Sequence, residues 1–166
     1  GTFIYHTHAD ETQQLTSGLY GPLLVLGEDE RPDTTDRLFL IGDAGPPTGP
    51  PGPAAPFING SSAPPPIELQ ADTPHRFRIV SISSALTRRV RLVSETGVEL
   101  WRAVAKDGAE LPPRQAVMRN ASIDLGPGET ADFTVRRAKR EVLTLEIITS
   151  PLSRRAIVTK VPVIVR

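Results

Sequence analysis

Two of the three histidines in this chain lie one residue apart, close to its start. His6 and His8 belong to the stretch GTFIYHTH, whose residues favour a β-strand. Residues i and i+2 of a strand project to the same face, with Cα atoms roughly 6.5–7 Å apart. Two imidazoles placed in this way can bind one metal ion, or one ring each to two neighbouring ions. Imidazole suits copper, zinc, iron and nickel.

Two histidines do not complete a metal site, because even a catalytic zinc site takes three protein ligands. The third histidine, His75, lies at the start of another expected strand, and we interpret it as a partly exposed strand residue rather than a ligand. Asp10 and Glu11 follow the histidine pair closely. We favour the interpretation that they are solvated turn residues, and the alternative is that they hydrogen-bond the metal-binding rings.

Composition excludes several other kinds of protein. The 166 residues contain 19 Lys or Arg and 19 Asp or Glu, and this balance argues against a nucleic-acid partner bound through bulk charge. The absence of cysteine excludes disulfides, thiolate metal sites and thiol nucleophiles. No G-x-S-x-G segment supports a hydrolase, and no apolar run approaches the roughly 18 residues of a membrane span. Because no signal peptide is visible and the first residue is Gly1, we expect a processed, trimmed or excerpted chain.

The periodicity of the chain is almost wholly that of β-strands separated by turn residues, which predicts an all-β sandwich or barrel. No segment shows a sustained helical period of 3.6 residues. The expected strands are Thr2–His8, Gly21–Gly27, Arg37–Ile41, Ile67–Ala71, His75–Ile82, Arg88–Ser94, Glu99–Ala105, Ser122–Leu125, Ala131–Arg136, Val142–Ile148 and Ile157–Val165.

Some individual residues also have an expected place. Val90 and Leu92 should point into the core, while the arginines at 88, 89 and 91 should lie on a solvated face, like those at 136, 137 and 140. Trp101 alternates with charged neighbours and is expected in the core rather than as a substrate platform. The stretch Gly45–Pro66 holds nine of the seventeen prolines, which predicts a stiff surface loop that acts as a spacer.

The segment around the two histidines resembles a signature of the multicopper oxidases, the laccase-like enzymes. That signature has the form G-T-x-W-Y-H-x-H, followed about a dozen residues later by G-L-x-G-x and an apolar run that ends in Val. Ile4 replaces the usual tryptophan and Thr7 stands where serine is common, but neither change removes a ligand. The matching positions are Gly1, Thr2, Tyr5, His6, His8, Gly18, Leu19, Tyr20, Gly21, Pro22 and Val25.

Three later segments extend the resemblance in the family's order to about Ile148: FINGSSAPPPIELQADTPHRFRIVSIS, VAKDGAELPP and IDLGPGETADFTV. The resemblance implies a cupredoxin-like Greek-key β-sandwich or barrel that is preceded by strands from another cupredoxin domain. On this basis residues 1–27 are the C-terminal part of a first cupredoxin domain. Residues 28–166 are then a second cupredoxin-like domain without its own copper site.

The resemblance also implies an activity. Multicopper oxidases couple one-electron oxidation of a reducing substrate to the four-electron reduction of dioxygen to water. By the same resemblance, His6 and His8 are ligands of the type 3 copper pair, one to each copper. The family needs four histidine-bearing segments, and its type 1 copper needs a cysteine thiolate. This chain has one such segment and no cysteine, so it is expected to be an incomplete and inactive portion of an oxidase.

The partners implied are the remaining cupredoxin domains of the same enzyme, dioxygen and a small reducing substrate. The family resemblance further implies a secreted or periplasmic location, and it leaves the oligomeric state and the number of domains open. Two other classes compete with this interpretation. A copper nitrite reductase relative ranks lower, because a cysteine follows the histidine in that family whereas Thr7 does so here. A non-catalytic β-sandwich module with the proline-rich loop as its contact surface also remains open.

Overall fold

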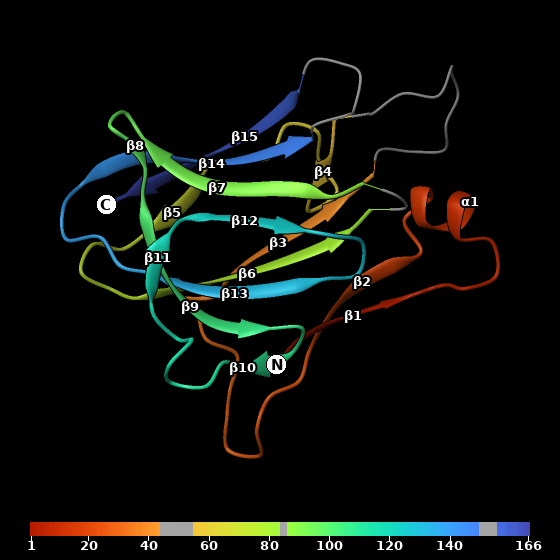
Figure 1. The fold of residues 1–166 in the computed structure, drawn as a ribbon, viewed down its shortest axis with the longest axis horizontal. Coiled ribbons are helices and arrows are strands. Elements are labelled where there is room, and N and C mark those ends of the chain that lie inside the picture. The colour runs from red at the N-terminus through yellow and green to blue at the C-terminus, as the bar shows by residue number, and fades with distance from the viewer. Residues whose placement is uncertain (44–54, 84–85, 150–155) are drawn as a thin grey trace.

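The alternating pattern of the sequence produces a structure that consists almost entirely of strands (Figure 1). The computed structural model describes residues 1–43, 55–83, 86–149 and 156–166. Its elements are β1 (Thr2–His6), α1 (Glu11–Thr16), β2 (Tyr20–Leu24), β3 (Arg37–Gly42), β4 (Phe57–Ile58), β5 (Ile67–Leu69), β6 (His75–Ile82), β7 (Arg88–Ser94), β8 (Gly97–Val98), β9 (Leu100–Lys106), β10 (Ala109–Glu110), β11 (Met118–Asn120), β12 (Ser122–Leu125), β13 (Thr130–Val135), β14 (Glu141–Thr149) and β15 (Ile157–Val165).

Every strand expected from the sequence is present, with ends that differ by at most three residues. The sequence did not predict α1 or the short strands β4, β8, β10 and β11. These strands have two or three residues, which is too short for an alternating pattern to show. Within the described residues, α1 is the one helix, and its six residues are too few to span a membrane.

Two of the three sheets form a β-sandwich, which confirms the expected fold class. One sheet has the strand order β10-β9-β13-β6-β3-β4, with β11 beside β9, and the other has the order β12-β7-β14-β15-β5, with β8 beside β7. The pairs β3–β6 and β5–β15 are parallel. Strands distant in sequence therefore lie side by side, as Greek-key connections produce. Between the sheets, Trp101 is fully buried and stacks on Phe133 with ring centroids 3.9 Å apart, so it is a core residue as expected.

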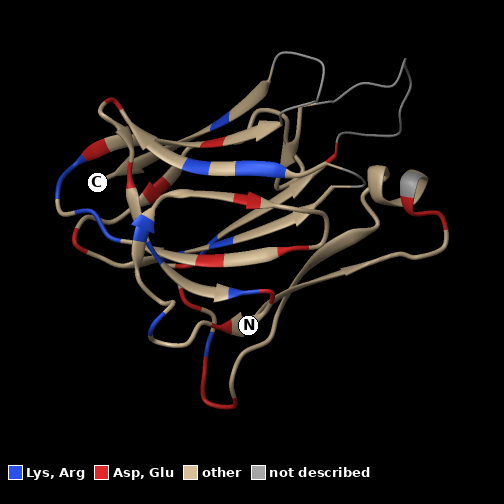
Figure 2. Ribbon diagram, viewed as in Figure 1, with Lys and Arg blue, Asp and Glu red and all other residues tan. Residues whose placement is uncertain are grey.

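The outer face of the second sheet carries paired charges, which Figure 2 shows on β7 and β12. Arg89 forms an ion pair with Asp124, and Arg91 forms one with Glu146. The expectation that Arg88 is solvated is wrong, because its side chain is 1% exposed and donates to Asp43 at 2.5 Å. Side chains alternate along a strand, so Arg88 shares the inward face of Val90 and needs a buried partner.

The second half of the proline-rich stretch folds back on β3, whereas residues 45–54 of the expected spacer loop lie outside the described residues. Phe57 and Ile58 form β4, which pairs with β3, and Ile58 is buried. Asn59 adopts φ +51°, and its side chain forms hydrogen bonds with the backbone at Leu38 and Leu40. This part is therefore ordered by contacts with the sheet rather than being only a spacer.

The third sheet is the hairpin β1–β2, which runs along one side of the sandwich and carries α1 at its far end (Figure 1). His6 lies opposite Tyr20 in the hairpin register, and Tyr5 lies opposite Gly21. An isolated two-stranded hairpin is at best marginally stable in water. The strand that carries His6 therefore depends on contacts with the sandwich for its position.

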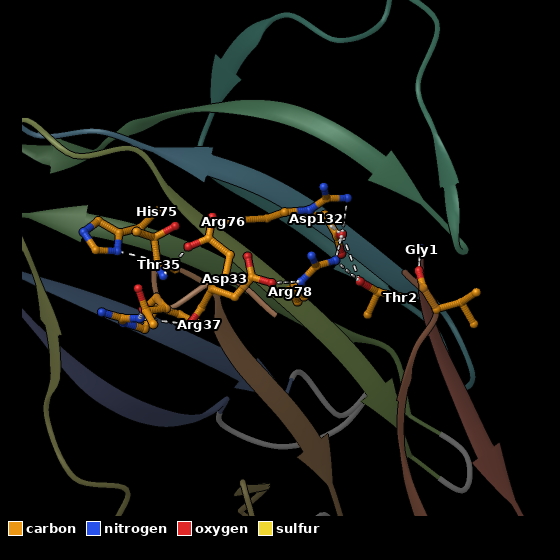
Figure 3. A network of polar contacts seen from close by, with 12 residues as sticks. Gly1, Thr2, Asp33, Thr35, Arg37, His75, Arg76, Arg78 and Asp132 are labelled. Carbon is orange, nitrogen blue, oxygen red and sulfur yellow. Dashed lines mark hydrogen bonds and ion pairs between the residues drawn. The ribbon is translucent and has the colours of Figure 1, made fainter. Parts of the chain in front are cut away.

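A buried polar network fastens the start of β1 to the first sheet of the sandwich (Figure 3). The Thr2 hydroxyl donates to Asp132 Oδ2 at 2.9 Å and accepts from Arg78 Nη1 at 2.9 Å. Arg78 and Arg76 both form ion pairs with the same carboxylate oxygen, at 3.0 Å and 2.7 Å. The Thr130 hydroxyl donates to the Thr2 carbonyl oxygen at 2.9 Å. Side chains of β6 and β13 thus fix the first residue of β1.

Two aromatic rings of the hairpin rest directly on glycine backbone of the sandwich. A Cβ atom at Gly42 would lie 2.0 Å from the hydroxyl oxygen of Tyr20, and one at Gly108 would lie 2.1 Å from the Phe3 ring. Side chains at these positions would displace the rings. Burial raises the pKa of the Tyr20 hydroxyl, and the nearby Asp43 carboxylate raises it further. The hairpin is therefore held at three places along its length.

We predict that Asp132→Ala lowers the free energy of unfolding by about 3–5 kcal/mol, because it leaves Arg76 and Arg78 without their shared buried partner. The matched control is Asp124→Ala, which removes a carboxylate paired with Arg89 at the exposed surface and should cost less than about 1 kcal/mol. Urea unfolding of the two variants measures the difference. Equal losses of unfolding free energy in the two variants would show that the buried network does not stabilise the fold more than an exposed ion pair does.

Candidate metal centre

The rings of His6 and His8 lie next to one another at the end of the hairpin, with centroids 4.4 Å apart and planes inclined by 41°. Strand β1 ends at His6, so Thr7 and His8 belong to the loop that leads into α1 rather than to the strand that the sequence predicted. The loop nevertheless brings the two rings to the same side. His6 is half-buried, whereas the side chain of His8 is 76% exposed.

Hydrogen bonds orient both imidazoles through the same ring nitrogen. His6 Nδ1 lies 3.0 Å from the carbonyl oxygen of Thr7, and His8 Nδ1 lies 2.9 Å from Glu11 Oε1. A carbonyl or carboxylate oxygen only accepts, so Nδ1 carries the proton in each contact. The Nε2 lone pair of each ring is then available to a metal ion, in the arrangement that metal-binding histidines usually adopt.

The loop between the two histidines and α1 is fastened by polar side chains. The Thr7 hydroxyl donates to Gln14 Oε1, and the Thr7 N–H donates to the Leu19 carbonyl oxygen at 3.3 Å. Asp10 caps the helix by accepting from the N–H of Gln13 at 3.2 Å. The short helix therefore holds the histidine loop in a defined shape.

The described residues bring three groups with metal-binding chemistry together here: His6, His8 and Glu11. One ligand atom from each lies within 4.8 Å of the others. Imidazole nitrogens with a carboxylate nearby suit copper or zinc. A closed site needs a fourth ligand, and a coupled pair of ions needs more. The donors present fit part of a metal site.

His75 does not join this group. It is 2% exposed at the start of β6, its Nδ1 donates to the Thr35 carbonyl oxygen at 3.1 Å, and its Nε2 accepts from the Gln70 N–H at 2.9 Å. The expectation of a partly exposed residue is wrong, because the chain before β6 and the loop before β3 both close over the ring. Both ring nitrogens of His75 are hydrogen-bonded to backbone groups, which gives this histidine a structural role.

A cleft of about 600 Å³ lies away from the histidine pair, between the start of the chain and β6. Gly1, Arg31, Arg76 and Arg78 are among its lining residues, and Figure 3 shows Gly1 and the arginines of β6 on this side. Hydrogen bonds from Thr35 lower the pKa of Asp33, another lining residue. None of His6, His8 and Glu11 lines this cleft.

Comparison with known proteins finds similarity in structure alone. No family model and no curated protein matches the chain. A blue copper oxidase from Nitrosomonas europaea matches with a TM-score of 0.74 and 19% identity, over 99% of this chain and 56% of that one. The 2F4 variant of the McoA multicopper oxidase from Aquifex aeolicus matches with a TM-score of 0.76 and 20% identity, over 100% and 41% of the two chains.

A multicopper oxidase from Pseudomonas thermotolerans also matches, with a TM-score of 0.68 and 26% identity, over 87% of this chain and 37% of that one. The resemblance to multicopper oxidases that the sequence indicated is thus confirmed at the level of the fold. The fold of this chain is that of a segment of these proteins, and the chain spans about half of their length or less.

We predict that His75→Ala lowers the free energy of unfolding by about 1–3 kcal/mol, because it leaves the buried Gln70 N–H and Thr35 carbonyl without their partner. The control is His8→Ala, which removes an exposed ring and should change stability by no more than about 0.5 kcal/mol. Chemical unfolding of both variants measures this. A His75 variant as stable as its parent would contradict the structural role.

Proposed function

We propose that this chain is a portion of a multicopper oxidase, a laccase-like oxidoreductase, in which His6 and His8 each bind one copper of the type 3 pair. The observation that carries the proposal is the pair of adjacent imidazoles, each held at Nδ1 by an oxygen acceptor, in a fold shared with multicopper oxidases. A non-catalytic sandwich module would have no need of two rings oriented in this way.

The bound copper centres would couple one-electron oxidation of a small reducing substrate to the four-electron reduction of dioxygen to water. The protein residues supply geometry. His6 and His8 present Nε2, while the Thr7 carbonyl and the Glu11 carboxylate hold the rings in place. The network at Thr2 fixes the strand behind His6 to the sandwich, so the first ring is placed by rigid elements.

The hairpin has the surface expected of one part of a larger domain. Phe3 touches Gly108 of the sandwich but is still 38% exposed, Tyr5 on the same side of β1 is 60% exposed, and Leu23, which lies opposite Phe3, is 48% exposed. An exposed apolar face of this kind usually packs against another element. We therefore propose that residues 1–27 are the C-terminal part of a first cupredoxin domain. Residues 28–166 form a second cupredoxin-like domain without its own copper site.

Other parts of the same enzyme must complete the chemistry. The chain has no cysteine for a type 1 copper and one of the family's four histidine-bearing segments. The partners in this proposal are the remaining cupredoxin domains, which supply the other ligands, together with dioxygen and the reducing substrate. The chain alone is inactive in this proposal. A secreted or periplasmic location belongs to the same proposal.

We predict that the full-length protein binds copper and oxidises a phenol with consumption of dioxygen. His6→Ala and His8→Ala should each lower the rate more than about 100-fold, since loss of a ligand should exceed the 10–100-fold cost of losing a residue that orients one. Both variants should keep the visible blue band of type 1 copper. Copper analysis, absorption spectra and oxygen uptake measure these outcomes.

The matched control is Asp124→Asn, which alters an exposed charge away from the hairpin and should leave copper content and rate unchanged. A full-length protein without copper would refute the oxidase proposal. Histidine variants that keep both the copper pair and the activity would refute the assignment of the ligands.

A further inference from the structure

The structure gives different hydrogen-bond partners to Asp10 and Glu11, two carboxylates that the sequence analysis treated alike. Asp10 Oδ1 accepts from the N–H of Gln13 at 3.2 Å, so this side chain is turned toward the helix that it caps. Glu11 Oε1 lies 2.9 Å from His8 Nδ1. Neighbouring acidic residues therefore have different partners, and one of them holds a ring of the histidine pair.

The local backbone sets the separation between Glu11 and His8. The two residues are three positions apart, across the turn that starts α1. Gln14 holds this turn from inside the helix, because its Oε1 accepts from the Thr7 hydroxyl and from the Asp10 N–H. Leu15, the next residue, is 6% exposed and anchors the helix. The contact between Glu11 and His8 thus follows from a constrained loop.

We propose that Glu11 is a positioning residue for His8, whose Nδ1 proton it holds so that Nε2 faces the copper. This proposal rests on the copper site proposed above. A neutral imidazole can carry its proton on either nitrogen, and a carboxylate acceptor at Nδ1 selects one tautomer and one ring orientation. His6 receives the same orientation from the Thr7 carbonyl, which is neutral main chain.

Glu11 could instead bind the metal itself, since one of its oxygens belongs to the group of atoms within 4.8 Å. The 2.9 Å distance between Glu11 Oε1 and His8 Nδ1 favours the positioning role, because this carboxylate already accepts a hydrogen bond from the ring. The side chains of His8 and Glu11 are 76% and 53% exposed, which leaves space for the segments that complete the site. As those segments exclude water, the contact becomes stronger.

The first experiment uses the copper-free full-length protein, at a pH where the imidazoles are neutral. Nitrogen-15 NMR should show His8 with its proton on Nδ1, and Glu11→Ala should shift it to a mixture of tautomers while His6 stays unchanged. Glu11→Gln retains an acceptor oxygen and should restore the parent tautomer. Asp10→Asn keeps the helix cap, removes a charge next to Glu11, and should have no effect. An unchanged His8 tautomer in Glu11→Ala would overturn the proposal.

The second experiment measures copper affinity in the same set of variants. Glu11→Ala should weaken binding at one copper of the pair by about 10–100-fold, and Glu11→Gln should recover most of the loss. If Glu11→Gln loses copper as fully as Glu11→Ala while keeping the His8 tautomer, the carboxylate is a ligand and the positioning role is wrong. If the parent protein binds no copper, the proposed copper site is wrong. The His8 tautomer in the copper-free protein tests the role of Glu11 independently of that outcome.

Discussion

One carboxylate oxygen joins the histidine-bearing hairpin to the rest of the molecule. Asp132 Oδ2 accepts from Thr2, Arg76 and Arg78, and its side chain is 1% exposed. Separation of the hairpin would remove Thr2 from this network and leave the buried Asp132, Arg78 and Thr130 side chains each without one hydrogen-bond partner, which is costly. A two-stranded sheet is only marginally stable by itself. The network therefore fixes the position of this sheet on the sandwich.

Other contacts fix the candidate metal site at the far end of the hairpin. Tyr20, opposite His6 in the register, packs on the bare backbone of Gly42, so the hairpin also meets the sandwich next to the ring. Beyond the strand, Gln14 holds the loop and α1 carries Glu11 to His8. Rigid strands place the first histidine and a small helix places the second.

The sequence predicted features that depend on local periodicity. The strands, the core place of Trp101 and the histidine pair all follow from residue type and spacing. It failed where distant residues decide the outcome. Arg88 is buried because Asp43 comes within reach, and His75 is buried because Thr35 and Gln70 supply its partners. The contact from Glu11 to His8 matches the less favoured of the two interpretations of Glu11, because a six-residue helix shows no period that would place the carboxylate beside the ring.

The bond between Thr2 and Asp132 spans 130 positions in sequence, and this separation dictates an order of events during folding. Long-range contacts form slowly because chain closure costs entropy before the contact stabilises anything. The hairpin precedes β6 and β13 in the sequence, and Thr2 can make its polar contacts only after those two strands have paired. The hairpin is thus among the last parts of the described structure to be ordered, and the positions of His6 and His8 depend on completion of the sandwich.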